Sequence, residues 1–194
     1  MALEEILSID LEDSVSFTKN RIFLIREDDS YGGYRASITA DFDTLNVPLK
    51  IDLTTGDVIT PREIVFKYPL MFEDRSLDIL SYNLETILAE KYETTIRRSA
   101  FNTRRRDFYD IYILMALHEG NIDFDLLKKA IKATSELRNS IEILVEADKI
   151  ITTLRGHSGM QSLWTLYQKE YSYAKEISWS DIVDAIVMIY NRIA

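Results

Sequence analysis

The sequence contains no cysteine and only two histidines. Disulfide bonds and thiolate metal sites are therefore excluded. His118 and His157 lie in surroundings without the spacing of metal ligands. A zinc site would have to rest mainly on carboxylates, which is not how proteins usually bind zinc. The sequence thus gives no indication of a zinc centre.

A long apolar segment is also lacking. No apolar run approaches the roughly 18–20 residues that a helix needs to span a bilayer. The N-terminal residues 1–7 are acidic and amphipathic, whereas a signal peptide has basic residues followed by an apolar run. We therefore expect a cytoplasmic protein.

The sequence has fewer basic than acidic residues, which gives a formal net charge of −9 over 194 residues. This balance argues against non-specific nucleic-acid binding as the whole function. Positions 91–106 are an exception, because they hold six basic residues and one acid, Glu93. The basic residues are Lys91, Arg97, Arg98, Arg104, Arg105 and Arg106. They predict either a site for a phosphate-bearing ligand or a solvated face paired with acids elsewhere.

The first half of the sequence has the pattern of strands. Short apolar or alternating segments, separated by turn residues, are typical of antiparallel hairpins. The predicted strands are residues 21–26, 34–39, 47–53, 64–68 and 77–80. Residues 3–9 fit either a helix or an extended lead-in.

From residue 83 onward the hydrophobic period becomes helical. Asp123 is a candidate N-cap, and Gly120 ends the helix before it. The predicted helices are 83–98, 104–118, one after Asp123, 140–154, 158–171 and 180–193. Strands followed by helices predict an α+β fold, with a mixed or antiparallel sheet lobe at residues 1–80 and a helical lobe at 81–194.

Charged residues occupy positions that the helical pattern assigns to the interior. Lys91 follows Ile87 by four residues, and Asp107 precedes Ile111 by four, so both lie on apolar faces. Asp110 lies one turn beyond Asp107. Burying an unpaired charge costs several kcal/mol, so these groups must be paired or functional. The pattern leaves two interpretations open: an ion pair between two helices, or a phosphate-binding lysine near an acid.

Asp52 is a third unusual charge. It lies at the end of the predicted strand 47–53, immediately before a turn that contains Gly56. Such a position suits a metal-binding carboxylate in two-metal chemistry. It also suits an aspartate that caps the turn, and the residues by themselves favour the cap.

Three segments carry a resemblance to a known family. KIDLTTGD at residues 50–57 is similar to the second motif of the AbiEii/AbiGii toxins. NLETILAEK at 83–91 resembles their third motif, which ends in a Glu-Lys pair. NTRRRDFYDIY at 102–112 resembles the fourth, an Arg-x-(Lys/Arg)-Asp-x-x-Asp signature. The motifs occur in the family's order, and YGGYR at 31–35 and the helical tail also fit.

This resemblance implies a nucleotidyltransferase-like fold that uses Mg²⁺ and a nucleoside triphosphate. Members include toxins that block growth by transferring a nucleotide, in some cases to tRNA, and that are paired with a repressor-type antitoxin. By resemblance, Asp52 is a metal-binding carboxylate, Lys91 holds the triphosphate, and Asp107 helps to organise the active site. The implied catalytic residues are Asp52, Lys91 and Asp107, and the implied substrate-binding residues are Lys50, Arg104, Arg106 and Asp110.

The sequence departs from the family at its first motif. That motif is a Gly-Gly or Gly-Ser pair that opens a helix, followed by Asp-x-Asp on a strand, and its aspartates bind the metals on which phosphoryl transfer depends. No such segment precedes position 20. Gly32-Gly33 followed by Asp41-Phe42-Asp43 looks similar to this motif. However, only seven residues separate Gly33 from Asp41, and their apolar and polar side chains alternate as in a strand. We interpret this segment as a hairpin and a loop, and expect an N-terminally truncated chain that begins just after the motif.

Three hypotheses follow from this departure. The first is a nucleotidyltransferase toxin that retains the fold but is inactive as this chain. The second is a non-enzymatic remnant that binds nucleotide, RNA or a partner through residues 97–106. In the third, Asp41 and Asp43 replace the missing pair. An uncovered sheet edge or apolar face would also favour self-association, so we expect a dimer or larger species.

Overall fold

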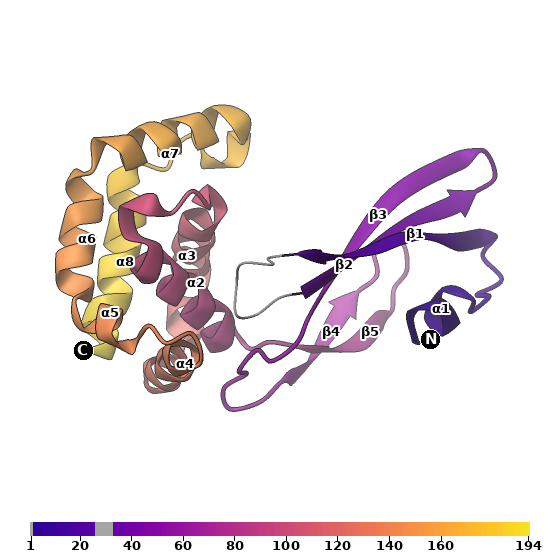
Figure 1. Ribbon diagram of the computed structural model, residues 1–194, viewed down its shortest axis with the longest axis horizontal. Helices are drawn as coiled ribbons and strands as arrows, with labels where there is room; N and C mark the ends of the chain where they lie inside the picture. Colours follow the sequence, from indigo (N-terminus) through magenta and orange to yellow (C-terminus); the bar gives the residue numbers. More distant parts are fainter. Residues whose placement is uncertain (1, 26–32) are drawn as a thin grey trace. The chain divides into compact units, whose positions relative to one another are not determined.

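The computed structural model describes residues 2–25 and 33–194 (Figure 1). The chain divides into two compact units, Met1–Asp57 and Val58–Ala194. Tyr31 and Gly32, which belong to the predicted turn and to the YGGYR segment, lie outside the described residues.

The first unit is a three-stranded antiparallel sheet preceded by a short helix (Figure 1). Its elements are α1 (Ala2–Leu7), β1 (Val15–Ile25), β2 (Gly33–Phe42) and β3 (Leu45–Thr54), with strand order β1-β2-β3. β1 starts earlier than the predicted strand 21–26, because its first half pairs with the end of β2. The register shifts between Lys19 and Arg21, where β1 has an irregularity.

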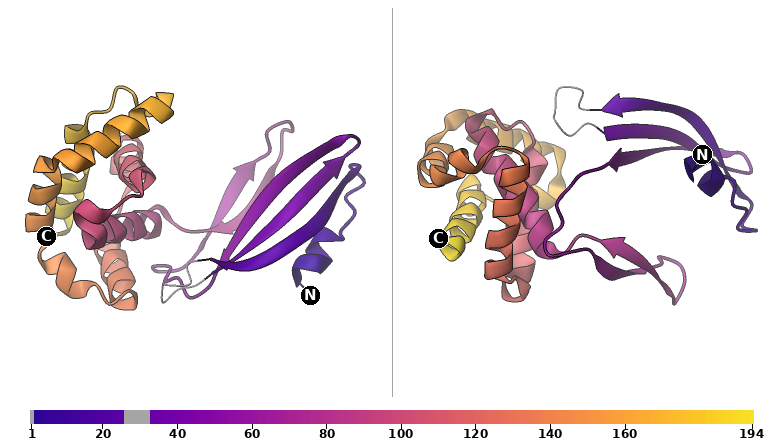
Figure 2. Two further views of the ribbon diagram at one scale, coloured as in Figure 1. Left: turned by 45° about the horizontal axis from the view of Figure 1, so that its top comes forward. Right: turned by 60° about the horizontal axis from the view of Figure 1, so that its bottom comes forward.

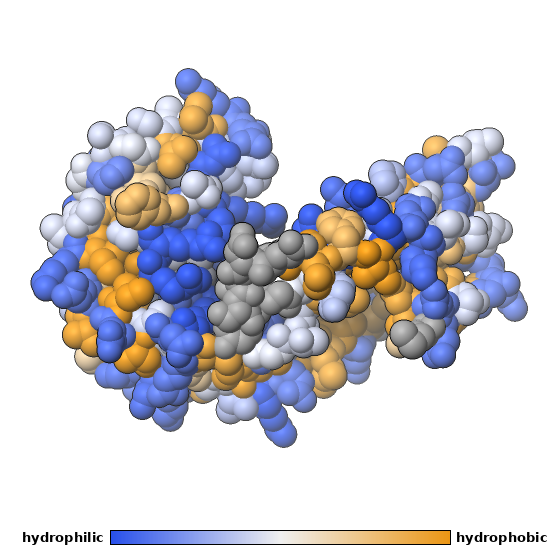
Figure 3. Space-filling view, viewed as in Figure 1, coloured by the Kyte–Doolittle hydropathy of each residue, from blue (hydrophilic) through white to orange (hydrophobic). Residues whose placement is uncertain are grey.

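One face of this sheet is apolar and exposed. Side chains alternate between faces along a strand, so every second residue of β3 shares a side. These residues are Leu45, Val47, Leu49, Ile51 and Leu53, each between 38% and 61% exposed. Their partners on β2 include Phe42 and Tyr34, which are exposed, and Ile38, which is buried. Figure 3 shows hydrophobic residues at the surface in the region that Figure 1 labels β1 to β3.

We expect the chain to self-associate through this apolar face. Contiguous exposed apolar patches mark association sites, because burying them removes hydrocarbon from water. Light scattering over a concentration series should show a dimer or a larger species. The double substitution of Leu49→Lys and Ile51→Lys should shift the chain toward the monomer. A wild-type chain that stays monomeric at the highest concentration would contradict this expectation.

The second unit starts with a hairpin and continues as helices. The hairpin strands are β4 (Ile64–Pro69) and β5 (Ser76–Ser81), which pair antiparallel. The helices are α2 (Leu84–Arg98), α3 (Arg105–His118), α4 (Phe124–Leu137), α5 (Ile141–Val145), α6 (Ala147–Gly156), α7 (Ser158–Glu170) and α8 (Trp179–Ile193). Three short 3₁₀ turns lie between them, at Ser99–Phe101, Glu119–Asn121 and Ser172–Ala174. The α+β class with antiparallel strands followed by helices is thus confirmed.

Side-chain caps fix where several helices begin. Asn83 accepts a hydrogen bond from the Thr86 backbone N–H, and Asp123 does the same for Leu126. α8 begins with a capping box formed by Ser178 and Asp181. The cap predicted at Asp123 is therefore confirmed.

The fourth predicted helix, 140–154, is wrong as a single element. The structure breaks it at Glu146, whose φ of −98° and ψ of 16° lie outside the helical range, and α5 and α6 flank the break. α6 buries Ala147, Ile151 and Leu154, and α5 packs the partly buried Leu144 against the same core. The apolar spacing therefore continues across Glu146 and does not reveal a one-residue interruption.

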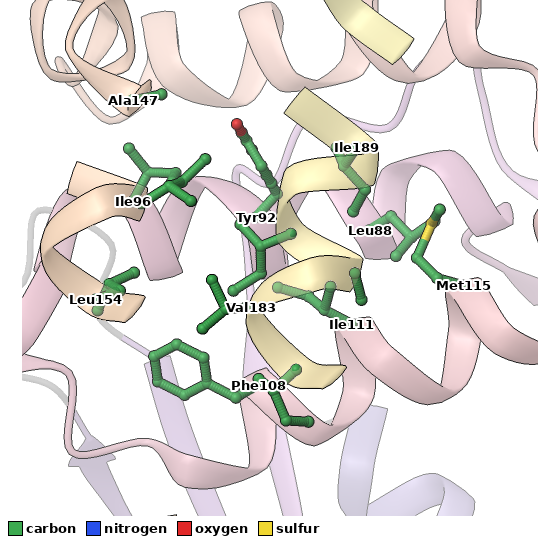
Figure 4. Close-up of a cluster of buried hydrophobic side chains, with 14 of the residues drawn as sticks. Leu88, Tyr92, Ile96, Phe108, Ile111, Met115, Ala147, Leu154, Val183 and Ile189 are labelled. Atoms are coloured by element: carbon green, nitrogen blue, oxygen red, sulfur yellow. The ribbon is translucent and has the colours of Figure 1, made fainter. Parts of the chain in front are cut away.

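The core of the second unit lies among α2, α3, α6 and α8. Figures 1 and 2 show these helices side by side, and Figure 4 shows their side chains converging. Fully buried residues of this cluster include Leu88, Tyr92, Ile96, Phe108, Ile111, Leu154, Val183 and Ile189. This packing holds α2 against α3, which are the two helices that carry the third and fourth motifs.

A buried carboxylate connects α2 to the end of α4. Glu93 is fully buried and accepts hydrogen bonds from Arg97 Nε at 2.7 Å, from an Arg138 guanidinium nitrogen at 2.7 Å and from Ser140 Oγ at 2.8 Å. Arg97, a member of the predicted basic patch, is therefore engaged in a structural ion pair.

No helix among residues 2–25 and 33–194 is long and apolar enough to cross a bilayer.

Candidate functional site

Lys91 of α2 lies between two aspartates of α3. Its Nζ donates to Asp107 Oδ1 at 2.9 Å and to Asp110 Oδ2 at 2.7 Å. The aspartates are three residues apart, so they project from the same side of α3 and both accept a hydrogen bond from the same ammonium group. The structure therefore shows the helix-to-helix ion pair that the sequence left open, with Asp110 as an additional partner.

The environment of Lys91 keeps it charged. Burial by itself would lower the pKa of Lys91, but its hydrogen bonds to Asp107 and Asp110, and their charges, outweigh burial and raise the pKa. The stability gained from this pair is therefore fully present below the pKa of an unperturbed lysine. It is lost only as the pH rises through the higher pKa of the folded protein. At neutral pH Lys91 is a fixed cation and cannot act as a general base.

Two arginines extend the cluster from the N-terminal end of α3. Arg104 Nε lies 3.1 Å from Asp107 Oδ2, and Arg106 Nε lies 3.8 Å from Asp110 Oδ1. Arg104 is positioned by Asn102, which is fully buried and accepts a hydrogen bond from the Arg104 backbone N–H at 3.0 Å. The arginines thus stand at the positive end of a helix dipole, where anions are favoured.

Asp107 has one unused acceptor. Its side chain is 3% exposed, and Oδ2 receives no hydrogen bond from the described residues although Arg104 forms an ion pair with it. Buried carboxylate oxygens normally accept a hydrogen bond. The Arg104 guanidinium, at ion-pair distance, is therefore the group that compensates the charge on this buried oxygen.

These groups line a pocket of about 500 Å³. Its walls carry four cationic side chains against two aspartates, which leaves an excess of positive charge. Besides the residues already described, the walls are formed by Thr103, Arg105, Tyr167 and Tyr171. A concave site with converging guanidinium groups is chemically suited to a phosphate-bearing ligand.

Asp52 and Lys50 belong to the first unit, on the polar face of β3. Arg35 of β2 donates to both carboxylate oxygens of Asp52, from Nε and from a terminal guanidinium nitrogen, each at 2.6 Å. The sequence offered a metal ligand or a turn cap for Asp52 and did not indicate this cross-strand ion pair. Lys50 is exposed and lies two residues from Asp52, on the same side of the strand.

The surroundings of Asp52 do not fit a magnesium ion as they stand. Mg²⁺ is held mainly by carboxylate oxygens and substrate phosphates in near-octahedral geometry. Both oxygens of Asp52 already accept from Arg35. Among the residues that the structure describes, no group of three or more histidines and carboxylates could hold a metal ion.

Residues 33–43, which look similar to the family's first motif, belong to a hairpin. Asp41 lies near the end of β2 and accepts hydrogen bonds from Asn46 and Thr18. Asp43 adopts a φ of 50° in the turn between β2 and β3. The interpretation of this segment as a hairpin and a loop is confirmed for residues 33–43, the part of it that the structure describes.

One family model, described as "Nucleotidyl transferase AbiEii toxin, Type IV TA system", matches residues 1–185. The chain belongs to the AbiEii family. Among solved structures, the crystal structure of JHP933 from Helicobacter pylori is similar at 16% sequence identity and a TM-score of 0.46. The match covers 91% of this chain and 66% of the solved one, which is just under two thirds of its length. No curated protein matches the chain.

In this AbiEii-family chain the structure brings together five of the seven predicted site residues. They are Lys91, Arg104, Arg106, Asp107 and Asp110. The other two, Lys50 and Asp52, lie on β3 of the first unit.

The sequence analysis missed the tyrosines of the pocket wall. A signal was present, because Trp164 and Tyr167 lie three residues apart on one side of α7, and Tyr171, the residue that ends this helix, follows four residues later.

Proposed function

We propose that this AbiEii-family chain binds the phosphates of a nucleoside triphosphate in the pocket between α2, α3 and α7. The observation that carries the proposal is the fixed Lys91 cation, flanked by arginines at the N-terminal end of α3. In this proposal the chain serves a cytoplasmic toxin–antitoxin system in which a nucleotide is transferred to an RNA, such as tRNA, or to a protein acceptor.

Each side chain has a distinct role in this proposal. Arg104 is half-exposed and Arg106 is largely exposed, so both still have N–H groups for phosphate oxygens, which a guanidinium can contact in pairs. Lys91 contributes a point charge. Asp107 and Asp110 position Lys91 and keep its ammonium group at the pocket, because they accept hydrogen bonds from two of its three N–H groups.

The metal-binding role of Asp52, and a substrate contact by Lys50, are also proposals. Asp52 would have to give up its ion pair with Arg35 before it could hold Mg²⁺. When bound, Mg²⁺ would neutralise charge on the phosphates. Phosphate binding by Lys91 and the arginines does not require the metal, so we expect it to persist when divalent ions are removed.

Triphosphate binding tests this function. Arg104→Ala should weaken the binding of a nucleoside triphosphate, and of inorganic triphosphate, about 10-fold, because charge-assisted hydrogen bonds to phosphate are lost. Calorimetric titration in EDTA and at low ionic strength provides the affinity.

Arg155→Ala is the matched control for this titration. Arg155 is as exposed as Arg104 and is also paired with an aspartate, Asp184, but it lies outside the pocket. Equal effects of the two substitutions, or no binding by the wild-type chain at millimolar ligand, would refute the proposed phosphate site.

A second candidate function is that of a non-enzymatic module that binds nucleotide, RNA or the cognate antitoxin. The ion pair between Arg35 and Asp52 favours it, because this pair occupies the carboxylate that catalysis would need. The transfer experiment described in the Discussion distinguishes the two candidates.

A further inference from the structure

We propose that Tyr171 stacks on a nucleobase whose phosphates occupy the Lys91–Arg104–Arg106 pocket. The inference rests on the proposed phosphate site. It adds a contact for the nucleobase that is attached to those phosphates. The base could belong to the nucleoside triphosphate or to an unpaired end of an acceptor RNA, since both present the same flat ring beside a phosphate.

The observation behind it is a column of aromatic rings that runs from the core to the pocket. Trp164 and Tyr167 are stacked, with ring centroids 5.2 Å apart and planes 24° apart. Tyr167 and Tyr171 follow at 4.6 Å and 39°. On the inner side Trp164 contacts Trp179, at 6.4 Å. The column therefore has one buried end and one end at the pocket wall.

Exposure rises at the outer end of the aromatic column, where Tyr171 and its neighbour Tyr173 lie. Trp164 is 2% exposed and Tyr167 3%, whereas Tyr171 is 36% exposed and lines the pocket. A tyrosine placed only for core packing would bury its ring against protein. Tyr171 contacts the rings of Tyr167, at 4.6 Å, and of Tyr173, at 5.4 Å, and still keeps 36% of its surface exposed beside the pocket, where a flat ligand ring can pack against it.

Hydrogen bonds hold the column rigid behind that surface. Trp164 Nε1 donates to the Ile177 carbonyl oxygen at 2.8 Å, and Trp179 Nε1 donates to that of Leu154 at 3.0 Å. The hydroxyl groups of Tyr167 and Tyr173 lie 2.9 Å apart and share a hydrogen bond. A platform that is already ordered loses little freedom when a ligand stacks on it.

The cations beside the column indicate which flat ring would bind. The Arg105 guanidinium carbon lies 5.9 Å from the centre of the Tyr167 ring, and Arg105 lines the same pocket as Tyr171. Aromatic rings interleaved with arginines are the usual surface for unpaired bases, because the rings stack and the arginines contact phosphate or the base plane.

The test compares Tyr171→Ala, Tyr171→Phe and Tyr171→Trp with Tyr68→Ala, which removes an exposed tyrosine of β4 outside the pocket. Anisotropy measures binding of a fluorescent nucleoside triphosphate and of a labelled single-stranded RNA octamer. Calorimetry measures inorganic triphosphate, which has no base. The thermal midpoint of each variant shows whether it remains folded.

Tyr171→Ala should weaken the binding of at least one of the two base-containing ligands about 5- to 150-fold, the range expected for loss of one stacked base. Binding of inorganic triphosphate should stay unchanged, and the phenylalanine and tryptophan variants should bind like wild type. A loss for the nucleoside triphosphate assigns the base to the substrate, and a loss for the RNA alone assigns it to the acceptor.

The inference is overturned if the alanine variant binds both base-containing ligands normally. It is equally overturned if inorganic triphosphate binding falls in parallel, or if phenylalanine fails to restore binding. Absence of any triphosphate binding by wild type refutes the phosphate site instead. In that case the RNA arm alone decides whether Tyr171 stacks on a base, and a wild-type chain that binds no RNA either refutes both.

Discussion

Replacing Glu93 with alanine is expected to lower the free energy of unfolding by about 3 kcal/mol. The carboxylate is fully buried and accepts hydrogen bonds from Arg97, Arg138 and Ser140. Removing it takes the carboxylate away from Arg97 and leaves Arg138 with the more distant Glu90, at 3.7 Å, so two neighbouring guanidinium groups lose most of the charge that compensated them. Both arginines are 20–30% exposed and recover some hydration, so we expect the lower end of the range for broken buried pairs.

Urea denaturation followed by circular dichroism measures this loss. Glu136→Ala is the control, since Glu136 lies on the exposed side of α4 in an ion pair with Lys132, and its removal should change stability by less than about 1 kcal/mol. If the two substitutions cost the same, the buried network does not stabilise the helical unit.

The other large effect concerns catalysis. Incubation of the chain with each labelled nucleoside triphosphate, Mg²⁺ or Mn²⁺, and total tRNA is expected to transfer no label above background. Two-metal chemistry needs carboxylates that hold both ions in line with the reacting phosphate. Asp52 is engaged by Arg35, while Asp41 and Asp43 belong to a hairpin. Since errors near 1 Å can cost about a hundredfold in rate, an unformed metal site should abolish turnover.

Transfer of label would contradict this expectation, and further substitutions would then locate the site. Loss of transfer in Asp41→Ala or Asp43→Ala would show that the hairpin aspartates act as the metal ligands. Asp78→Ala is the matched control, because Asp78 is an exposed aspartate of β5. Transfer that survives all three substitutions but is lost in Asp52→Ala would make Asp52 the essential carboxylate.

Much of the helical unit could be predicted because its signals are local. Asp123 acts through an N–H three residues away, and the spacing of Lys91 and Asp107 from apolar neighbours placed both on inner faces. Opposite charges on the inner faces of two adjacent helices are expected to pair, because an unpaired buried charge is costly. The pairing of Lys91 with Asp107 could therefore be predicted, although the sequence did not distinguish a structural role of the pair from a functional one.

The features that sequence analysis missed depend on distant parts of the chain. Glu93 and Arg138 are 45 residues apart, so nothing near Glu93 shows that it is buried and paired. The first half of β1 is held by its pairing with β2, although its own residues are mostly polar. Asp52 was assigned from its neighbours along the strand, whereas its partner Arg35 lies across the sheet on β2.

The aromatic column has a spectroscopic consequence. Trp164 and Trp179 are the two tryptophans of the sequence, and both belong to the second unit. Tryptophan emission therefore reports unfolding of the helical unit alone, whereas far-ultraviolet circular dichroism also reports the three-stranded sheet. Coincident transitions would show that the two units unfold cooperatively, and separated ones that each unit has a stability of its own.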